Sequence, residues 1–191
     1  MCRDEQGNIT QLQSPGWVTL AVIPQIENYP ADERFSPKVS RIILERVSEY
    51  LRTRTSVFAK VQVINPVYQP ISFKGNIRLR AGRDATFYQK KLISEVQAYL
   101  SPWINSGSQN IVFGGTLMMS SVLQFIENRE YVDYVTDFTM FVKSGGVDGP
   151  AVKAVTADTP WSVLIGGEQT YTIITNDTCS GGSQQAVFRI K

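Results

Sequence analysis

The stretch NPVYQPISFKGNIRLRAGRDATFYQKKLISEVQAYLSP, residues 65–102, decides the fold because it joins a half-apolar strand to a half-apolar helix. Apolar and polar residues alternate over residues 71–79, which predicts a strand with one face on a core and one in water. Residues 84–100, with Asp84 or Thr86 as the cap, then repeat apolar side chains at three- and four-residue steps, as an amphipathic helix does. Pro102 ends this helix, because proline disfavours the helical conformation in the residue before it.

The residues before this stretch predict a strand, a helix and a second strand. Residues 17–23 are almost continuously apolar and β-branched, which predicts a buried strand. Ser36-Pro37 has the composition of a helix start, and apolar residues from Val39 to Leu51 predict one core-facing stripe. Residues 57–64 carry apolar side chains on both faces, which predicts a central strand that ends at Asn65-Pro66.

The residues after the helix predict shorter elements. Residues 111–119 suit a strand, interrupted at Gly114-Gly115 by a bulge or a close backbone approach. Ser120 or Ser121 can cap a short helix, and residues 132–142 alternate again as a strand. Beyond the glycine-rich residues 143–150, three short strands are expected at residues 162–165, 169–175 and 186–190.

The order of these elements predicts an α+β fold, in which amphipathic helices pack on one face of mixed sheets. A β-α-β unit is followed by a β-α-β-α-β unit and by a short β-rich C-terminal extension. We expect three parts: residues 1–66, a β-α-β subdomain with a polar N-terminal leader; residues 67–145, the β-α-β-α-β subdomain; and residues 146–191, the extension.

The composition argues against several kinds of partner. Apolar residues make up 42% of the chain and charged residues 19%, as in ordinary globular proteins. The net charge of +2 is too small to attract nucleic acid, and the arginines and lysines of residues 78–91 suit a solvated face. No run reaches the ~20 apolar residues of a membrane helix, so we expect no membrane partner. Cys2 and Cys179 form no recognisable motif, and a reducing compartment is the simpler expectation.

The residue types also argue against an enzyme. The chain contains no histidine, which removes the usual triads and most zinc or iron sites. It contains no glycine-rich nucleotide-binding motif, so we expect no catalytic residue, no cofactor and no metal. An acidic cluster could form the acid and base of a hydrolase, but its members fall on the polar sides of predicted elements, which favours a solvated face: Glu127, Glu130, Asp133 and Asp137.

Two tryptophans follow prolines in loops, at Pro102-Trp103 and Pro160-Trp161. A loop aromatic either staples the loop to its own core or docks into a neighbouring chain, where tryptophan is enriched at binding hot spots. Both alternatives are open for Trp103 and Trp161.

The order and spacing of seven pieces resemble the C-terminal part of baseplate J-like proteins, the wedge subunits of contractile phage tails and related injection systems. The pieces are Tyr50-Leu51, Val61 to Ile64, Pro66-Val67-Tyr68-Gln69-Pro70, Ile71 to Leu79, Leu100-Ser101-Pro102, Phe113-Gly114 and Val132 to Val135. The resemblance covers residues 17–142. Baseplate J-like proteins are usually longer, so we expect the chain to correspond to a C-terminal piece or a shortened homologue.

The resemblance implies a structural wedge subunit that joins its neighbours around the baseplate hub and relays the trigger for sheath contraction. Its partners would be other wedge subunits, hub or spike proteins and sheath proteins in a hetero-oligomeric ring, within a phage tail baseplate or an injection particle assembled in the bacterial cytoplasm. The alternative is a peptide- or glycan-binding module that uses the loop tryptophans.

The resemblance also implies structural roles for its motif residues. Pro66 and Pro70 would fix a turn between two strands, Tyr68 would fill the inside of that turn, and Gly114 would admit close backbone packing. The interface candidates are completed by Pro102, Trp103, Phe113 and Trp161.

Overall fold

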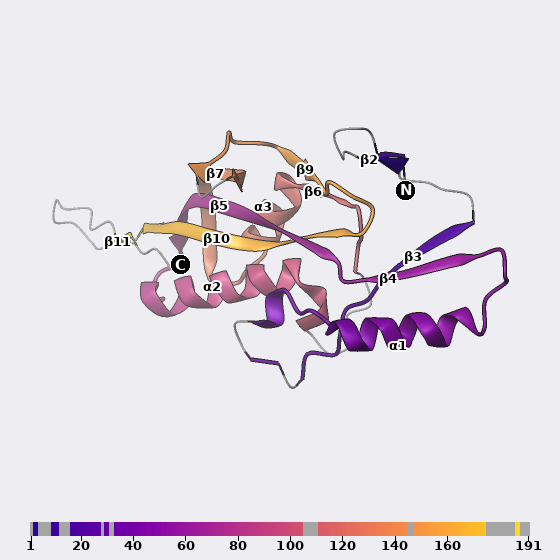
Figure 1. Cartoon of the computed structure of the whole chain (residues 1–191). Helices are drawn as coiled ribbons and strands as arrows, with labels where there is room; N and C mark the ends of the chain where they lie inside the picture. Colours follow the sequence, from indigo (N-terminus) through magenta and orange to yellow (C-terminus); the bar gives the residue numbers. More distant parts are fainter. Residues whose placement is uncertain are drawn as a thin grey trace.

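The computed structural model describes residues 2–3, 9–11, 16–27, 29–30, 33–104, 111–144, 147–174 and 186–187, and these form an α+β fold (Figure 1). The helices are α1 Arg41–Arg52, α2 Ala85–Leu100 and α3 Met119–Glu127, with 3-10 turns η1 Glu33–Phe35 and η2 Pro102–Ile104. The strands are β1 Cys2–Arg3, β2 Ile9–Gln11, β3 Trp17–Ala21, β4 Lys60–Ile64, β5 Val67–Leu79, β6 Thr116–Met118, β7 Val132–Ser144, β8 Val147–Asp148, β9 Ala154–Thr156, β10 Ser162–Ile174 and β11 Ala186–Val187. The predicted fold class is confirmed.

A five-stranded mixed sheet forms the main body, with the strand order β11-β10-β5-β7-β8. β10 runs parallel to β5, from the Ser162–Val67 pair to the Ile174–Arg78 pair, while β7 runs antiparallel to β5. The two short strands expected on either side of Gly166-Gly167 are one strand whose register shifts between Gly166 and Gln169. The segment expected as a C-terminal extension therefore supplies a strand beside β5; the division into three parts stays a prediction.

The core lies between this sheet and helices α2 and α3. Ile71, Phe73 and Ile77 of β5 are fully buried, as their alternation predicts. α2 packs on β10, α3 packs on β7, and the two helices contact each other, so they cover the same face of the sheet. The expected cap of α2 is confirmed, because an Asp84 carboxylate oxygen accepts a hydrogen bond of 2.6 Å from the Phe87 N–H.

Two strand boundaries around this core differ from the predictions. The segment expected as a turn is already strand, since β5 begins at Val67. The Val67 N–H donates to the Trp161 carbonyl, on the β10 side of β5. Because alternate residues of a strand direct their backbone groups to opposite neighbours, the nitrogen of Pro70 faces the β7 side. Pairing with β7 begins only at Ile71, so the missing N–H of Pro70 costs no hydrogen bond between the strands. The strand expected at 111–119 is confined to β6, after the positive φ of Gly114.

Helix α3 begins earlier than its expected caps. Its N-cap is Met118 and its first residue is Met119, so Ser120 and Ser121 lie in the first turn and do not cap it. The stripe of α3 is confirmed at Val122 and Ile126, which are fully buried.

A smaller unit, made of β3, α1 and β4, extends from the sheet at the end where β5 begins (Figure 1). β3 and β4 pair in parallel as a separate two-stranded sheet, and α1 packs against β4. The expected burial of the first strand is wrong: Trp17 is 48% and Val18 52% exposed. The expected central position of the second strand is also wrong, because in the described part of the chain β4 pairs only with β3.

Helix α1 starts at Arg41 with Ser40 as its N-cap, so the predicted start at Ser36-Pro37 is wrong. Pro37 is fully buried, and side chains from β5 and its approach hold residues 37–39 outside the helix. The expected stripe is only partly buried, since Ile42 and Ile43 are exposed and Val47 is half-buried.

Candidate functional site

Two features of the molecule bear on function: a junction that joins the small unit to the sheet, and an apolar end on the small unit. The junction contains most of the site residues expected from the sequence. It lies where the start of β5 meets the end of α2, the segment from η1 to the start of α1, residues 111–115 and the loop before β10.

Tyr68 and Trp103 connect the two parts of the molecule at the junction. Their ring centroids lie 5.7 Å apart at an interplanar angle of 58°. The Tyr68 hydroxyl donates to the carbonyl oxygen of Pro37 at 2.7 Å, and the Trp103 ring N–H donates to that of Arg34 at 2.9 Å. Burial raises the pKa of Tyr68 above its ordinary value of 10.0, which keeps the hydroxyl protonated as a donor. Trp103 thus staples its own chain, one of the two alternatives open from the sequence.

Asn65, just before the junction, is a residue that the sequence analysis treated only as a strand breaker. Its side-chain oxygen accepts from the Val39 N–H at 2.8 Å, and its side-chain nitrogen donates to the Val39 carbonyl at 2.9 Å. Both bonds are partly buried. The only signal in the sequence is a polar amide at the end of an apolar strand.

The remaining expected residues hold the neighbouring loops together. Gly114 has φ +64°, and a Cβ atom there would lie 3.0 Å from the Pro160 Cα, so the backbones approach closely at this point. Trp161 is half-buried, and its carbonyl oxygen accepts from the Val67 N–H at 3.3 Å. Pro66 precedes β5, while Phe113 is 36% exposed.

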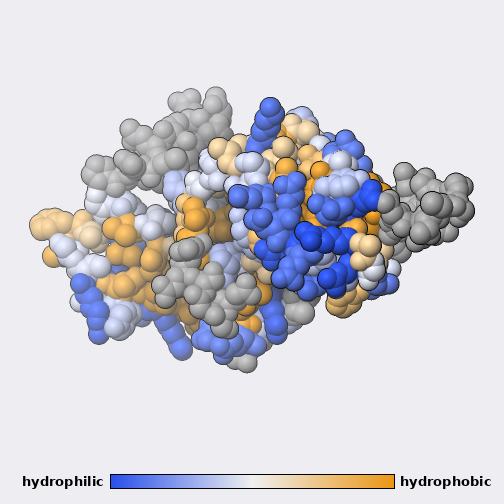
Figure 2. Space-filling model, turned by 180° about the vertical axis from the view of Figure 1, so that it is seen from behind, coloured by the Kyte–Doolittle hydropathy of each residue, from blue (hydrophilic) through white to orange (hydrophobic). Residues whose placement is uncertain are grey.

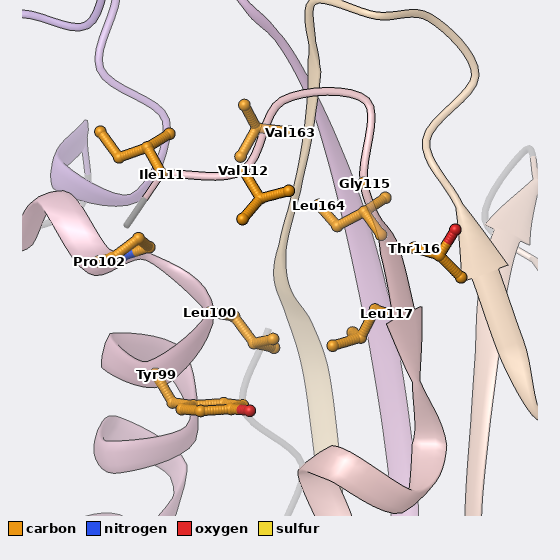
Figure 3. Close-up of a pocket in the computed structure, with 10 residues that line it drawn as sticks. All are labelled: Tyr99, Leu100, Pro102, Ile111, Val112, Gly115, Thr116, Leu117, Val163 and Leu164. Atoms are coloured by element: carbon orange, nitrogen blue, oxygen red, sulfur yellow. The ribbon is translucent and has the colours of Figure 1, made fainter. Parts of the chain in front are cut away.

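An apolar pocket of about 390 Å³ lies beside the junction, between the end of α2, residues 111–117 and β10 (Figure 3). Val112 and Leu117 point into it from residues 111–117 and Leu164 from β10, and Pro102 lies at one side. None of the ten described lining residues carries a charged side chain, and the polar side chains among them are those of Tyr99 and Thr116.

The acidic cluster considered as a catalytic alternative does not converge on this pocket. Asp133 lies 3.7 Å from Arg78, and Asp137 accepts from the Asn76 amide at 2.8 Å, both at the surface of the sheet. Over the described ranges, no three potential metal ligands come together, and no helix is long and apolar enough to cross a membrane. The carboxylates of Asp133 and Asp137 thus make surface contacts between β7 and β5.

The small unit carries an unusual density of exposed apolar side chains, which Figure 2 shows as orange at the left of the molecule. Val57 is 97% exposed and Phe58 89% exposed, both in the loop between α1 and β4. We name this surface the apolar end and define it by Trp17, Val18, Leu20, Ile43, Tyr50, Val57 and Phe58. Surfaces of this kind mark contacts with other molecules.

An α+β body whose small unit exposes an apolar end has a surface of the kind that contacts other chains. Residues 2–165 match the family described as baseplate protein PVC11-like, and the chain belongs to that family. The baseplate class implied by the sequence resemblance is therefore confirmed at this level.

The fold is similar to that of a chain in a cryo-EM structure of the anti-feeding prophage baseplate, determined with six-fold symmetrisation. The TM-score is 0.55 at 16% sequence identity, and the alignment covers 77% of this chain and 32% of that chain. The chain therefore spans about a third of the relative that it matches. A search of curated proteins finds no match.

Proposed function

We propose that the chain is a structural wedge subunit in the baseplate of a contractile injection particle. It joins neighbouring wedge, hub or spike and sheath proteins in a hetero-oligomeric ring and relays the trigger for sheath contraction. The membership of the PVC11-like baseplate family carries this proposal.

The junction supports the relay part of the proposal. A relay needs a block that moves without deforming, so that displacement of one contact surface displaces the other. Tyr68 and Trp103 reach from the sheet side to the segment before α1, and Asn65, at the end of β4, holds the same segment. A force on the small unit would therefore pass into the five-stranded sheet through these contacts.

The test is to delete the gene in a strain that produces the particles and to restore it with wild-type or variant copies. We expect the deletion to abolish sheathed particles in electron micrographs, and the wild-type copy to restore them. Particles that assemble and contract without the chain would refute the proposal.

A variant separates the relay from assembly. Tyr68→Phe together with Trp103→Phe removes both hydrogen bonds of the junction and keeps an aromatic ring at each position. We expect these particles to assemble but to contract less often when triggered. Tyr134→Phe is the matched control, because its hydroxyl accepts only an exposed contact from Arg78 at 3.2 Å. Equal contraction of the double variant and the control would remove the relay from the proposal.

The alternative, a peptide- or glycan-binding module based on the loop tryptophans, has less support. The Trp103 ring N–H donates to the carbonyl of Arg34, and the Trp103 ring contacts that of Tyr68, while Trp161 is half-buried. We likewise propose a non-enzymatic role and assembly of the particle in the bacterial cytoplasm.

A further inference from the structure

The outer edge of β3 has backbone groups that need partners. In the part of the chain that the structure describes, β3 pairs with β4 and with no other strand. Parallel strands are usually buried within larger sheets, and a two-stranded sheet is marginal alone. The small unit therefore has the form of a sheet that lacks a strand.

Two hydrogen bonds fix which residues of β3 face outward. The Lys60 N–H donates to the Gly16 carbonyl at 2.7 Å, and the Val22 N–H donates to the Ile64 carbonyl at 3.0 Å. In a parallel ladder only alternate residues of a strand bond to a given neighbour. Gly16 and Val22 are both even-numbered. The backbone N–H and carbonyl groups of the even-numbered residues between them, Val18 and Leu20, therefore point toward β4. Trp17, Thr19 and Ala21 direct their N–H and carbonyl groups away from β4.

One face beside this edge is apolar. Val18 is 52% and Leu20 40% exposed, and the register sets them beside Val61 and Val63, which are half-buried. The opposite face is mixed, because Thr19 lies beside Gln62 while Trp17 lies beside Lys60 and Ala21 beside Ile64. A strand added to this edge would match it with apolar side chains at every second position.

The end of the unit where the two strands begin is basic. Residues 50–64 contain Arg52, Arg54 and Lys60 and no carboxylate. Each of the three side chains is exposed, and the three residues flank the apolar Val57-Phe58 tip in the sequence. A complementary partner would carry acidic side chains at this end.

From the free edge, the apolar face and the basic end together, we propose that β3 binds an extended strand of a neighbouring baseplate chain. That strand has apolar side chains at alternate positions and carboxylates near Arg52 and Lys60, and it hydrogen-bonds to Trp17, Thr19 and Ala21. Main-chain bonds at a sheet edge supply affinity, while alternate side chains supply specificity. The identity of the occupant rests on the proposed function; the open edge does not.

Amide hydrogen exchange measured on the isolated chain and on purified particles tests this pairing. In the isolated chain, the amides of Val18 and Leu20 exchange slowly and those of Trp17, Thr19 and Ala21 rapidly. In the particles, the second group slows by more than about tenfold. Slow exchange of that group in the isolated chain, or rapid exchange in both samples, overturns the proposal.

Charge reversal tests the acidic partner. Arg52→Glu with Lys60→Glu reverses two exposed cations at the basic end, whereas Lys90→Glu with Lys153→Glu makes the same charge change on the body. With unchanged thermal midpoints, we expect the first pair to lower incorporation into particles by about tenfold and the second to leave it unchanged. Equal incorporation of the two double variants overturns the electrostatic part.

Three further outcomes separate the alternatives. Vesicles of phosphatidylglycerol and phosphatidylcholine are added to the isolated chain, because apolar tips flanked by cations also bind lipid; protection of the Val57-Phe58 tip by vesicles, with none in particles, would overturn the proposal in favour of a membrane. If particles contain the chain but its edge amides still exchange rapidly, the proposed function stands and the strand pairing fails. If particles form without the chain, the proposed function fails.

Discussion

The side-chain amide of Asn65 pairs with both backbone groups of Val39, accepting from its N–H at 2.8 Å and donating to its carbonyl at 2.9 Å. The two residues are 26 positions apart, and α1 and β4 lie between them. This pair closes the small unit at the point where the chain enters the five-stranded sheet. It also holds Val39 outside the helix, which is why α1 begins two residues later, at Arg41.

Replacing Asn65 by alanine should destabilise the fold. The change leaves the partly buried N–H and carbonyl of Val39 without these partners, which costs about 1–3 kcal/mol. Asn76→Ala is the control, because its amide makes an exposed bond to Asp137, and we expect it to change stability by about 0.5 kcal/mol or less. Urea unfolding of both variants measures the difference; equal losses would show that the Val39 pair adds nothing.

Local patterns predicted the main body well. Alternation of apolar and polar residues predicted β5 and β7, and an apolar stripe of period 3.6 with a cap at Asp84 predicted α2. Each of these signals lies within the element or next to its first residue. The start of α1 could not be predicted in this way, because it depends on Asn65 and Tyr68, which contact Val39 and Pro37 from 26 and 31 positions away.

The exposure of β3 could not be predicted from the sequence either. An apolar run such as residues 17–23 reads the same whether its cover comes from the same chain or from another. The sequence did identify Tyr68, Trp103 and Gly114, which the structure brings to one junction. The open edge of β3 depends instead on strand order, which periodicity does not encode.

Gly114→Ala should destabilise the protein more than Gly82→Ala. Both glycines have positive φ, +64° and +77°, which costs an L-residue about 1–2 kcal/mol. Only at Gly114 would the new Cβ meet backbone, 3.0 Å from the Pro160 Cα; at Gly82 no described atom lies within 4 Å. We expect thermal unfolding to show an additional loss of about 1–3 kcal/mol at Gly114. Equal losses of stability would mean that the loop containing Pro160 shifts without a measurable energetic cost.

Ser101→Ala should leave stability unchanged or raise it. The Ser101 side chain is fully buried at the end of α2, and its hydroxyl oxygen has no hydrogen-bond partner among the described atoms. Removing a buried, unpaired hydroxyl stabilises by up to about 1 kcal/mol. Ser162, equally buried, shares a 2.6 Å hydrogen bond with the Thr159 hydroxyl, so Ser162→Ala should cost about 1 kcal/mol. Destabilisation by both changes to the same extent would contradict this account.

The acid limb of the stability curve should depend on Asp148. A hydrogen bond from Lys74, and secondarily the charge of Lys143 at 3.5 Å, hold the pKa of Asp148 below its ordinary value of 3.8. The folded state therefore binds this proton less readily than the unfolded state does. The contribution is complete above the unfolded pKa and is lost as pH falls through the folded pKa.

Asp148→Asn should consequently flatten the decline of the thermal midpoint below about pH 4, where the wild-type carboxylate becomes protonated. Lys143 acts at the other limb: a hydrogen bond to Glu168 raises its pKa above 10.5, so its contribution is complete below the unfolded pKa and is lost as pH rises through the folded pKa. Asp148→Asn should leave most of that alkaline loss in place, because Glu168 is the larger cause. Since Asp148 is exposed, 1 M salt, with a Debye length of about 3 Å, should shrink the acid difference. Parallel wild-type and variant curves from pH 2 to 5 at low salt would show that Asp148 has no such role.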